Sequence, residues 1–164
     1  FHIEETLRQL NICKLLQSKG VKIMVENIGH ITLDKISTHS KLLSKFNAPI
    51  MPLGPLPTDA AINEDHIANA IGASFAAHVG CAHIINCVTR YEHSKSAITQ
   101  DVTIEAIRAA KVAAHIADLS RNINEANLYD TSITNNRVKE HCCFADSNNC
   151  TRCSTVCPLK LTSI

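Results

Sequence analysis

The sequence lacks tryptophan and is poor in the residues that dominate fibrous, disordered or loop-rich chains. Only 4% of its 164 residues are aromatic, and it contains 5 glycines and 5 prolines. Glycine and proline this scarce exclude a collagen-like or low-complexity chain. The remaining composition, with 45% hydrophobic and 19% charged residues, is that of a globular protein long enough to bury a core.

An excess of charge of one sign is also absent, because 16 basic residues balance 15 acidic ones. Neither nucleic acid nor an anionic membrane surface is therefore expected as a partner. No apolar run approaches the roughly 20 residues that span a bilayer, and no signal-peptide pattern opens the chain. We therefore expect a cytoplasmic protein that does not cross a membrane.

Cysteine is abundant, with 8 residues, but its distribution argues against disulfides. Cys13, Cys81 and Cys87 lie in apolar, periodic segments, whereas the other five crowd into residues 142–157. Secreted disulfide scaffolds usually spread their cysteines through a loop-rich chain. The clustering favours metal ligation in a reducing cytosol.

Alternating helix and strand patterns predict an α/β fold. Apolar residues at helical spacing predict helices over residues 4–19, 32–46, 63–78 and 101–121. Short apolar runs predict strands over residues 21–26, 48–51 and 82–88. Such alternation implies a parallel sheet with right-handed crossovers, either part of a (β/α)₈ barrel or a small open sheet. A complete barrel needs about 200 residues or more. We expect one domain over residues 1–121 and an irregular, cysteine-rich tail over residues 122–164.

In parallel β/α proteins, functional side chains gather in the loops that follow the strands. Each predicted strand is followed by side chains suited to metal or substrate binding. They are Glu26 and His30 after the first strand, Met51 and Asp59 after the second, and Glu92 and His93 after the third. Asp65 and His66 open the helix between the last two strands, where an acidic side chain also favours the helix dipole.

His30 and His93 could bind one divalent metal through neutral imidazole nitrogens and leave positions open for substrate or water. Alternatively, each histidine caps a helix or bonds to a backbone carbonyl group. Glu26 could grip a substrate hydroxyl or amine, or be an ordinary carboxylate that emerges into water. The residues alone leave these alternatives open.

The tail carries a more specific pattern, Cys150-x2-Cys153-x3-Cys157-Pro158. It matches the last three cysteines of the ferredoxin run C-x2-C-x2-C-x3-C-P. Three thiolates on a 4Fe–4S cluster leave one iron open to chelate S-adenosylmethionine, whose cleavage produces a radical. A structural zinc with Cys142 or Cys143 as fourth ligand is the alternative.

Several ordered motifs in the chain resemble those of one enzyme family. The stretches concerned are Glu-Asn-Ile-Gly-His at 26–30, Ala-Pro-Ile-Met-Pro-Leu-Gly-Pro-Leu-Pro-Thr-Asp at 48–59, Asp-His-Ile at 65–67, Glu-His at 92–93 and AAKVAAHIADL at 109–119. Together they resemble the C-terminal part of the phosphomethylpyrimidine synthase family and its close relative, 5-hydroxybenzimidazole synthase. The resemblance runs over about residues 4–121 and resumes at the terminal cysteines.

That family is an atypical radical S-adenosylmethionine group built on a (β/α)₈ barrel, and it acts on aminoimidazole ribotide. The resemblance therefore implies that the chain forms the last βα units of a partial barrel. It further implies that His30 and His93 bind an auxiliary divalent metal such as zinc, and that Glu26 contacts the substrate. Met51 stands where the family has a substrate-contacting tyrosine. By the same resemblance, the 4Fe–4S ligands are Cys150, Cys153 and Cys157.

The chain departs from the family mainly at the expected active site. Met51 replaces the tyrosine, Asn27 and Ile28 replace Gly-Pro, residues 94–96 differ after His93, and the cysteine spacing is shorter by one residue. These changes favour an altered product, and we expect a carbon–carbon lyase that makes 5-hydroxybenzimidazole for anaerobic cobamide synthesis. The first alternative is the phosphomethylpyrimidine synthase of thiamine biosynthesis. The second is a non-catalytic fragment that binds zinc or an iron–sulfur cluster.

The family's upstream substrate-binding segments, S-R-G-G and D-G-L-R, are not found in the chain. We therefore expect that the chain alone is not a competent enzyme. The resemblance implies a homodimer in the complete protein, or a partner chain that supplies the N-terminal half.

Overall fold

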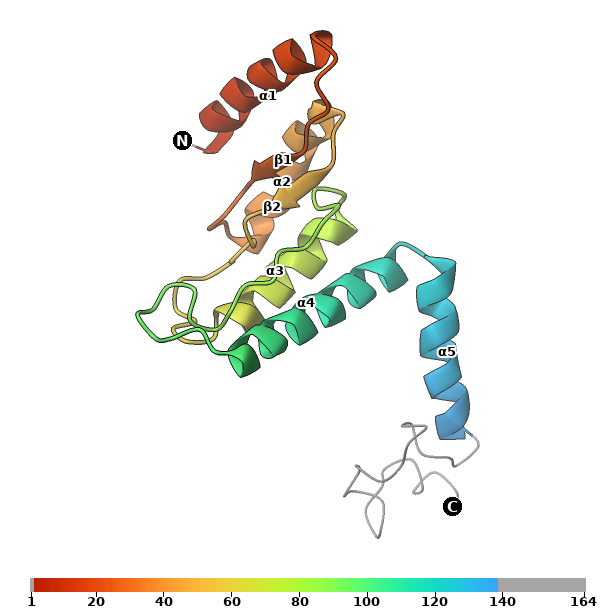
Figure 1. Cartoon of the computed structure of the whole chain (residues 1–164). Coiled ribbons are helices and arrows are strands. Elements are labelled where there is room, and N and C mark those ends of the chain that lie inside the picture. The colour runs from red at the N-terminus through yellow and green to blue at the C-terminus, as the bar shows by residue number, and fades with distance from the viewer. Residues whose placement is uncertain (1, 139–164) are drawn as a thin grey trace. The chain divides into compact units, whose positions relative to one another are not determined.

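The computed structural model describes residues 2–138 (Figure 1). The chain divides into two compact units, Phe1–Arg121 and Asn122–Ile164. Within residues 2–138, the first unit contains strands β1 and β2 and the helices α1 to α4, and the second contains the helix α5.

The helices of the first unit are α1 (His2–Ser18), α2 (Leu33–Leu43), the short 3₁₀-helix η1 (Ser44–Phe46), α3 (Asp65–His78) and α4 (Gln100–Ser120). All four predicted helices are thus confirmed to within two residues, apart from the 3₁₀ end of the second. Local signals set their ends: Gly20 adopts a φ of 79° just after α1, and the Thr99 side chain accepts a hydrogen bond from the Val102 amide at the start of α4. None of the described helices is long and apolar enough to cross a lipid bilayer.

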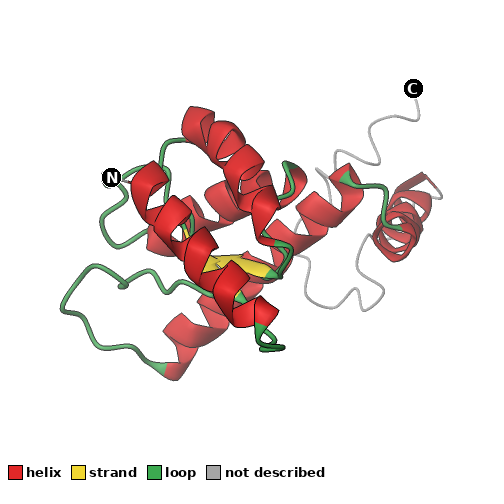
Figure 2. Cartoon of the chain, turned by 90° about the horizontal axis from the view of Figure 1, so that it is seen from above, coloured by secondary structure: helices red, strands yellow, loops and turns green. Residues whose placement is uncertain are grey.

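The sheet consists of two parallel strands, β1 (Val25–Asn27) and β2 (Ile50–Pro52), which lie among the helices in Figure 2. Val25 pairs with Ile50, and both are buried. Glu26 pairs with Met51 on the opposite face, because side chains alternate along a strand. A parallel pair connected through a helix agrees with the predicted βαβ pattern. The barrel implied by the family resemblance stays a prediction.

The predicted strand over residues 82–88 is wrong. The segment lies beside β2, and the His83 and Ile84 amides both donate to the Ile50 carbonyl oxygen. The Ile50 amide, however, donates to Nδ1 of the His83 ring instead of to a backbone carbonyl. The side chain thus takes the position that a ladder hydrogen bond needs, and no strand forms there.

Two further expectations need correction. The first strand is shorter than predicted, because residues 21–24 lie outside β1. The sequence predicts an irregular tail over residues 122–164, yet α5 covers Asn124–Val138. Polar residues predominate in this helix and its few apolar residues are not gathered on one face, so it lacks the apolar periodicity by which helices are recognised.

The core of the first unit joins helices and strands through one hydrophobic cluster. Its members are Leu10, Cys13, Val25, Ile28, Ile31, Ile36, Leu43, Phe46, Ile50, Ala76, Ala77, Cys81, Ala82 and Ala117. Small residues bring α3 and α4 close together, so that these helices lie side by side (Figure 1). The Ser74 hydroxyl of α3 donates across this contact to the Ala113 carbonyl oxygen at 3.2 Å.

One glycine is required where the loop after β2 packs on α3. A Cβ atom added at Gly72 would overlap the carbonyl oxygen of Pro55. The close approach fixes the start of the loop over residues 53–64, which leads to Asp59 and then to the first residue of α3.

Candidate metal centre

The structure brings His30 and His93 together. His30 follows β1 and His93 precedes α4, yet their Nε2 atoms lie 3.2 Å apart and their ring centroids 4.7 Å apart. Two Zn–N bonds of about 2.1 Å at a tetrahedral angle place the nitrogens about 3.4 Å apart. The observed separation therefore suits two ligands of one ion. About half of each side chain is exposed, so an ion can reach the pair from solvent.

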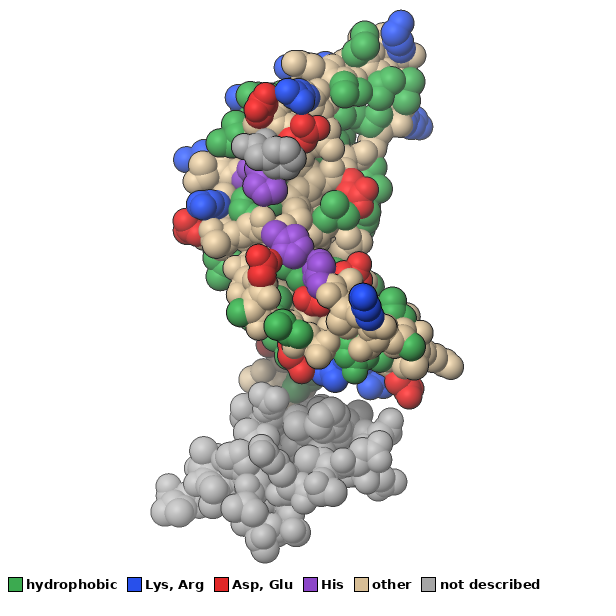
Figure 3. Space-filling view, turned by 90° about the vertical axis from the view of Figure 1, so that its left-hand side faces the viewer, with side chains coloured by type: hydrophobic (Ala, Val, Ile, Leu, Met, Phe, Trp, Pro, Cys, Tyr) green, Lys and Arg blue, Asp and Glu red, His purple; other side chains and the backbone are tan. Residues whose placement is uncertain are grey.

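Each histidine is held at its other ring nitrogen by a carboxylate. Nδ1 of His30 lies 2.6 Å from Oδ1 of Asp59, and Nδ1 of His93 lies 3.3 Å from Oδ1 of Asp65. A carboxylate at Nδ1 favours the tautomer that carries its proton there and leaves the Nε2 lone pair free for a metal. Figure 3 shows histidine and acidic side chains side by side on one face of the molecule. This geometry has the form of a metal site with its outer supporting groups.

Local structure explains why these side chains meet. Ile28 has a φ of 49° and turns the chain after β1, and backbone hydrogen bonds then tie Gly29 and Ile31 to Leu56. These bonds hold His30 against the loop that carries Asp59. Asp65 is buried at the first position of α3, where the helix dipole favours a negative charge.

Asp65 also holds the backbone of the His93 loop. Its Oδ2 atom accepts a hydrogen bond from the His93 amide at 3.2 Å, while Oδ1 faces the His93 ring. One carboxylate thus positions both the main chain and the side chain of His93.

The histidine pair opens into a cavity of about 240 Å³. Its lining residues are His30, Thr58, Asp59, Ile62, Asn63, Asp65, His93 and Ser94. Among residues 2–138 no group of three or more His, Cys, Asp or Glu side chains is arranged to hold a metal ion. The two imidazoles would therefore supply only part of a coordination sphere and leave the remaining positions to water or substrate, as in catalytic sites.

Other predicted site residues lie in different surroundings. Glu26 is exposed and Met51 half-buried, and they are direct neighbours on one face of the sheet. Glu92 is exposed in the turn before His93, and its amide donates to the Thr89 carbonyl oxygen. His66 is buried, and its ring faces a separate charged cluster rather than the histidine pair.

The proposed cluster ligands Cys150, Cys153 and Cys157 lie outside the described residues. The cysteines within residues 2–138 are free thiols, and Cys81 is fully buried. Burial raises the pKa of Cys81 to about 11, so this thiol stays protonated and unreactive at neutral pH.

Sequence reasoning missed the charged cluster around His66. Arg90 bridges Glu64, at the start of α3, and Glu105, on α4. Nothing in the spacing of these residues indicates the contact, which depends on how α3 and α4 pack.

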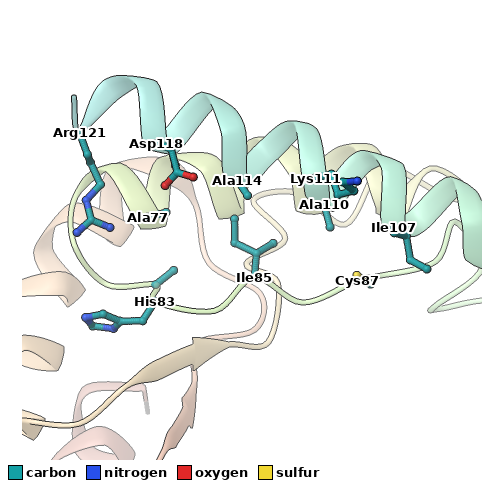
Figure 4. A pocket seen from close by; sticks show the side chains of 12 residues that line it. Ala77, His83, Ile85, Cys87, Ile107, Ala110, Lys111, Ala114, Asp118 and Arg121 are labelled. Atoms are coloured by element: carbon teal, nitrogen blue, oxygen red, sulfur yellow. The ribbon is translucent and has the colours of Figure 1, made fainter. Parts of the chain in front are cut away.

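A second cavity, of about 340 Å³, lies between α4 and residues 82–87 (Figure 4). Figure 4 shows Asp118 and Arg121 at the C-terminal end of α4, with His83 on the segment opposite. Most of the remaining wall is alanine and isoleucine. None of the residues predicted to bind metal or substrate lines this cavity, so it is not the candidate site.

Comparison with known proteins shows where the chain belongs. The profile described as "Radical SAM ThiC family" matches residues 1–143. The phosphomethylpyrimidine synthase of Carboxydothermus hydrogenoformans is 41% identical over 126 residues, which cover 76% of this chain and 29% of that protein. Phosphomethylpyrimidine synthase 1 of Methanosarcina barkeri is 32% identical over 181 residues, which cover 97% of this chain and 42% of that protein. The Clostridium tetani phosphomethylpyrimidine synthase is 38% identical over 134 residues, covering 80% and 29%. The chain thus spans less than half the length of these curated relatives.

Proposed function

The chain belongs to the radical SAM ThiC family, and from this we propose that it provides the metal-binding and cluster-binding part of a phosphomethylpyrimidine synthase. The relatives described above all carry that name. They favour this activity over the 5-hydroxybenzimidazole synthase that the active-site departures had suggested. The observation within the chain that best supports the proposal is the convergence of His30 and His93, each held by a carboxylate.

In this proposal, His30 and His93 bind an auxiliary divalent ion, for which the resemblance suggests zinc. Their spacing fits such an ion, the carboxylates at Nδ1 favour the tautomer that it needs, and the cavity of about 240 Å³ leaves room for a polar group of the substrate. Glu26 and Met51, which are neighbours of each other on one face of the sheet, would contact aminoimidazole ribotide. Met51 offers the substrate an apolar thioether where a tyrosine would donate a hydrogen bond.

Cys150, Cys153 and Cys157 would hold the 4Fe–4S cluster. Three closely spaced thiols suit such a cluster as a donor set and would leave one iron free for S-adenosylmethionine. When bound, the cluster and S-adenosylmethionine supply the radical that starts the rearrangement of the substrate. The chain's own contribution is to hold these groups and to orient the substrate.

A chimera tests the proposal. Residues 1–164 would replace the corresponding region of the Carboxydothermus hydrogenoformans enzyme, and the product would be assayed anaerobically with aminoimidazole ribotide, S-adenosylmethionine and a reductant. Matched chimeras with Cys157→Ala or His93→Ala are the controls.

We expect hydroxymethylpyrimidine phosphate and 5′-deoxyadenosine from the chimera, and neither from the Cys157 control. Formation of 5-hydroxybenzimidazole would contradict the assigned product. Absence of 5′-deoxyadenosine from a folded, cluster-loaded chimera would contradict the radical activity and favour a non-catalytic binding module.

A further inference from the structure

The loop that carries His93 is attached to the start of α3 at two places. At one, His93 contacts Asp65 through both its amide and its ring. At the other, Arg90 contacts Glu64, the residue immediately before Asp65. Two loop residues three positions apart therefore meet two adjacent residues at one helix N-terminus.

Arg90 makes the more extensive of these attachments. Its Nη2 atom donates to both carboxylate oxygens of Glu64, at 3.1 and 3.3 Å. Its Nε atom lies 3.0 Å from Oε2 of Glu105 on α4, a charge contact without an aligned hydrogen bond. Burial of the guanidinium opposes its charge, but Glu105 and Glu64 outweigh that effect and raise the pKa of Arg90. Arg90 is therefore a permanent cation that links the loop to two helices.

The charges around Arg90 explain what its loss would do. Nε2 of His66 lies 3.5 Å from a Glu105 oxygen and 3.8 Å from a Glu64 oxygen, so both carboxylates lie close to one buried ring. Without Arg90 the two negative charges would repel each other across this ring. The second turn of α4, which carries Glu105, would tend to separate from the start of α3, and the loop between the two helices would loosen.

We propose that Arg90 is a positioning residue for the histidine pair: by bridging Glu64 and Glu105 it fixes the loop that places His93 Nε2 within 3.2 Å of His30 Nε2. In this proposal Arg90 is a ligand of neither the ion nor the substrate. The inference rests on the proposed metal role of the two histidines. It adds that metal affinity depends on a charged cluster that contains no metal ligand.

The test measures binding of Co²⁺, whose visible spectrum reports its ligands, to the full chain. The five tail cysteines, Cys142, Cys143, Cys150, Cys153 and Cys157, are replaced by alanine in every variant so that their thiolates do not compete. Arg90→Gln should raise the Co²⁺ dissociation constant about 10-fold, the lower end of the range for loss of an outer supporting group. Arg90→Lys should be intermediate, because an ammonium group does not reproduce the fork of a guanidinium. Arg121→Gln, which removes an exposed arginine at the far end of α4, is the matched control and should bind as the parent does.

Two further readouts separate positioning from general stability. Arg90→Gln should speed exchange of the metal-free His93 amide, which donates to Asp65, more than exchange of core amides in α3. Adding Glu105→Gln to Arg90→Gln should restore part of the Co²⁺ affinity, because it removes one of the unbalanced carboxylates.

The outcomes distinguish this inference from the function on which it rests. If the parent chain binds no Co²⁺, or if His30→Ala leaves binding unchanged, the metal role is wrong and the inference is wrong with it. If the parent binds Co²⁺, His30→Ala abolishes binding and Arg90→Gln binds as tightly as the parent, the inference alone is wrong.

Discussion

Replacing Asp65 by asparagine should weaken metal binding at the histidine pair more than the same change at Asp59. The side chain of Asp65 is 9% exposed; its Oδ2 atom accepts a hydrogen bond from the His93 amide, and its Oδ1 atom lies 3.3 Å from Nδ1 of the His93 ring. Asparagine keeps the size of the side chain, but it removes the charge and has only one oxygen to serve the two donors. Loss of such an outer group costs about 10- to 100-fold in metal affinity, or about 1.4 to 2.7 kcal/mol.

The distance to the histidine and the burial of the carboxylate predict opposite orders for the effects of Asp59→Asn and Asp65→Asn on metal affinity. Asp59 lies closer to its histidine, at 2.6 Å against 3.3 Å, but its side chain is 83% exposed. Water screens an exposed pair strongly, so burial should decide the order. We expect about 100-fold weaker binding for Asp65→Asn and about 10-fold or less for Asp59→Asn.

The assay is competition of each variant with a chromophoric chelator for Zn²⁺, in the background without the five tail cysteines. Asp101→Asn, an exposed acidic change on α4, is the control and should have no effect. A larger loss for Asp59→Asn than for Asp65→Asn would refute the argument from burial. Unchanged affinity in both variants would refute the supporting role of the carboxylates.

Three further predictions follow from single buried or exposed groups. Burial lowers the pKa of His39, so as the pH falls the unfolded state takes up a proton at this residue before the folded state does. The free energy of unfolding should therefore fall as the pH drops below about 6.5. Urea unfolding should show a smaller loss of stability between about pH 7.5 and 5.5 in His39→Gln than in the parent, and an equal loss would refute this. Gly72→Ala should lower the free energy of unfolding by about 1–3 kcal/mol, because the new Cβ atom overlaps the Pro55 carbonyl oxygen. This cost should exceed the gain from the better helix propensity of alanine. A variant that is more stable in chemical denaturation would contradict the close contact between Gly72 and Pro55. Cys87 is exposed and Cys81 is buried, so iodoacetamide should alkylate Cys87 before Cys81 in the folded protein. Mass spectrometry after a brief treatment measures this order, and the reverse order would be inconsistent with the fold.

Apolar periodicity predicted the helices of the first unit well, because each buries one face against the sheet or a neighbouring helix. It failed where side chains replaced the regular pattern. Residues 82–88 have the composition of a strand, but the His83 ring accepts the hydrogen bond from the Ile50 amide. Helix α5 has almost no apolar periodicity, so the sequence did not predict it.

The rule that functional residues follow strand ends singled out His30 and His93, and their rings meet in the structure even though the strand predicted over residues 82–88 does not form. Their metal role stays a prediction. The rule could not assign Asp59 and Asp65 to their histidines, since that pairing depends on the path of the loop over residues 53–64. The contacts of Arg90 with Glu64 and Glu105 could not be predicted from the sequence either, because they depend on the packing of α4 against α3.

The most direct test of the central claim is the zinc content and coordination of the full chain in the background without the five tail cysteines. We predict one Zn²⁺ per chain, two imidazole nitrogens at about 2.1 Å in its X-ray absorption spectrum, and loss of the ion in both His30→Ala and His93→Ala. Zinc bound equally well by the chain that lacks His93 would contradict the claim.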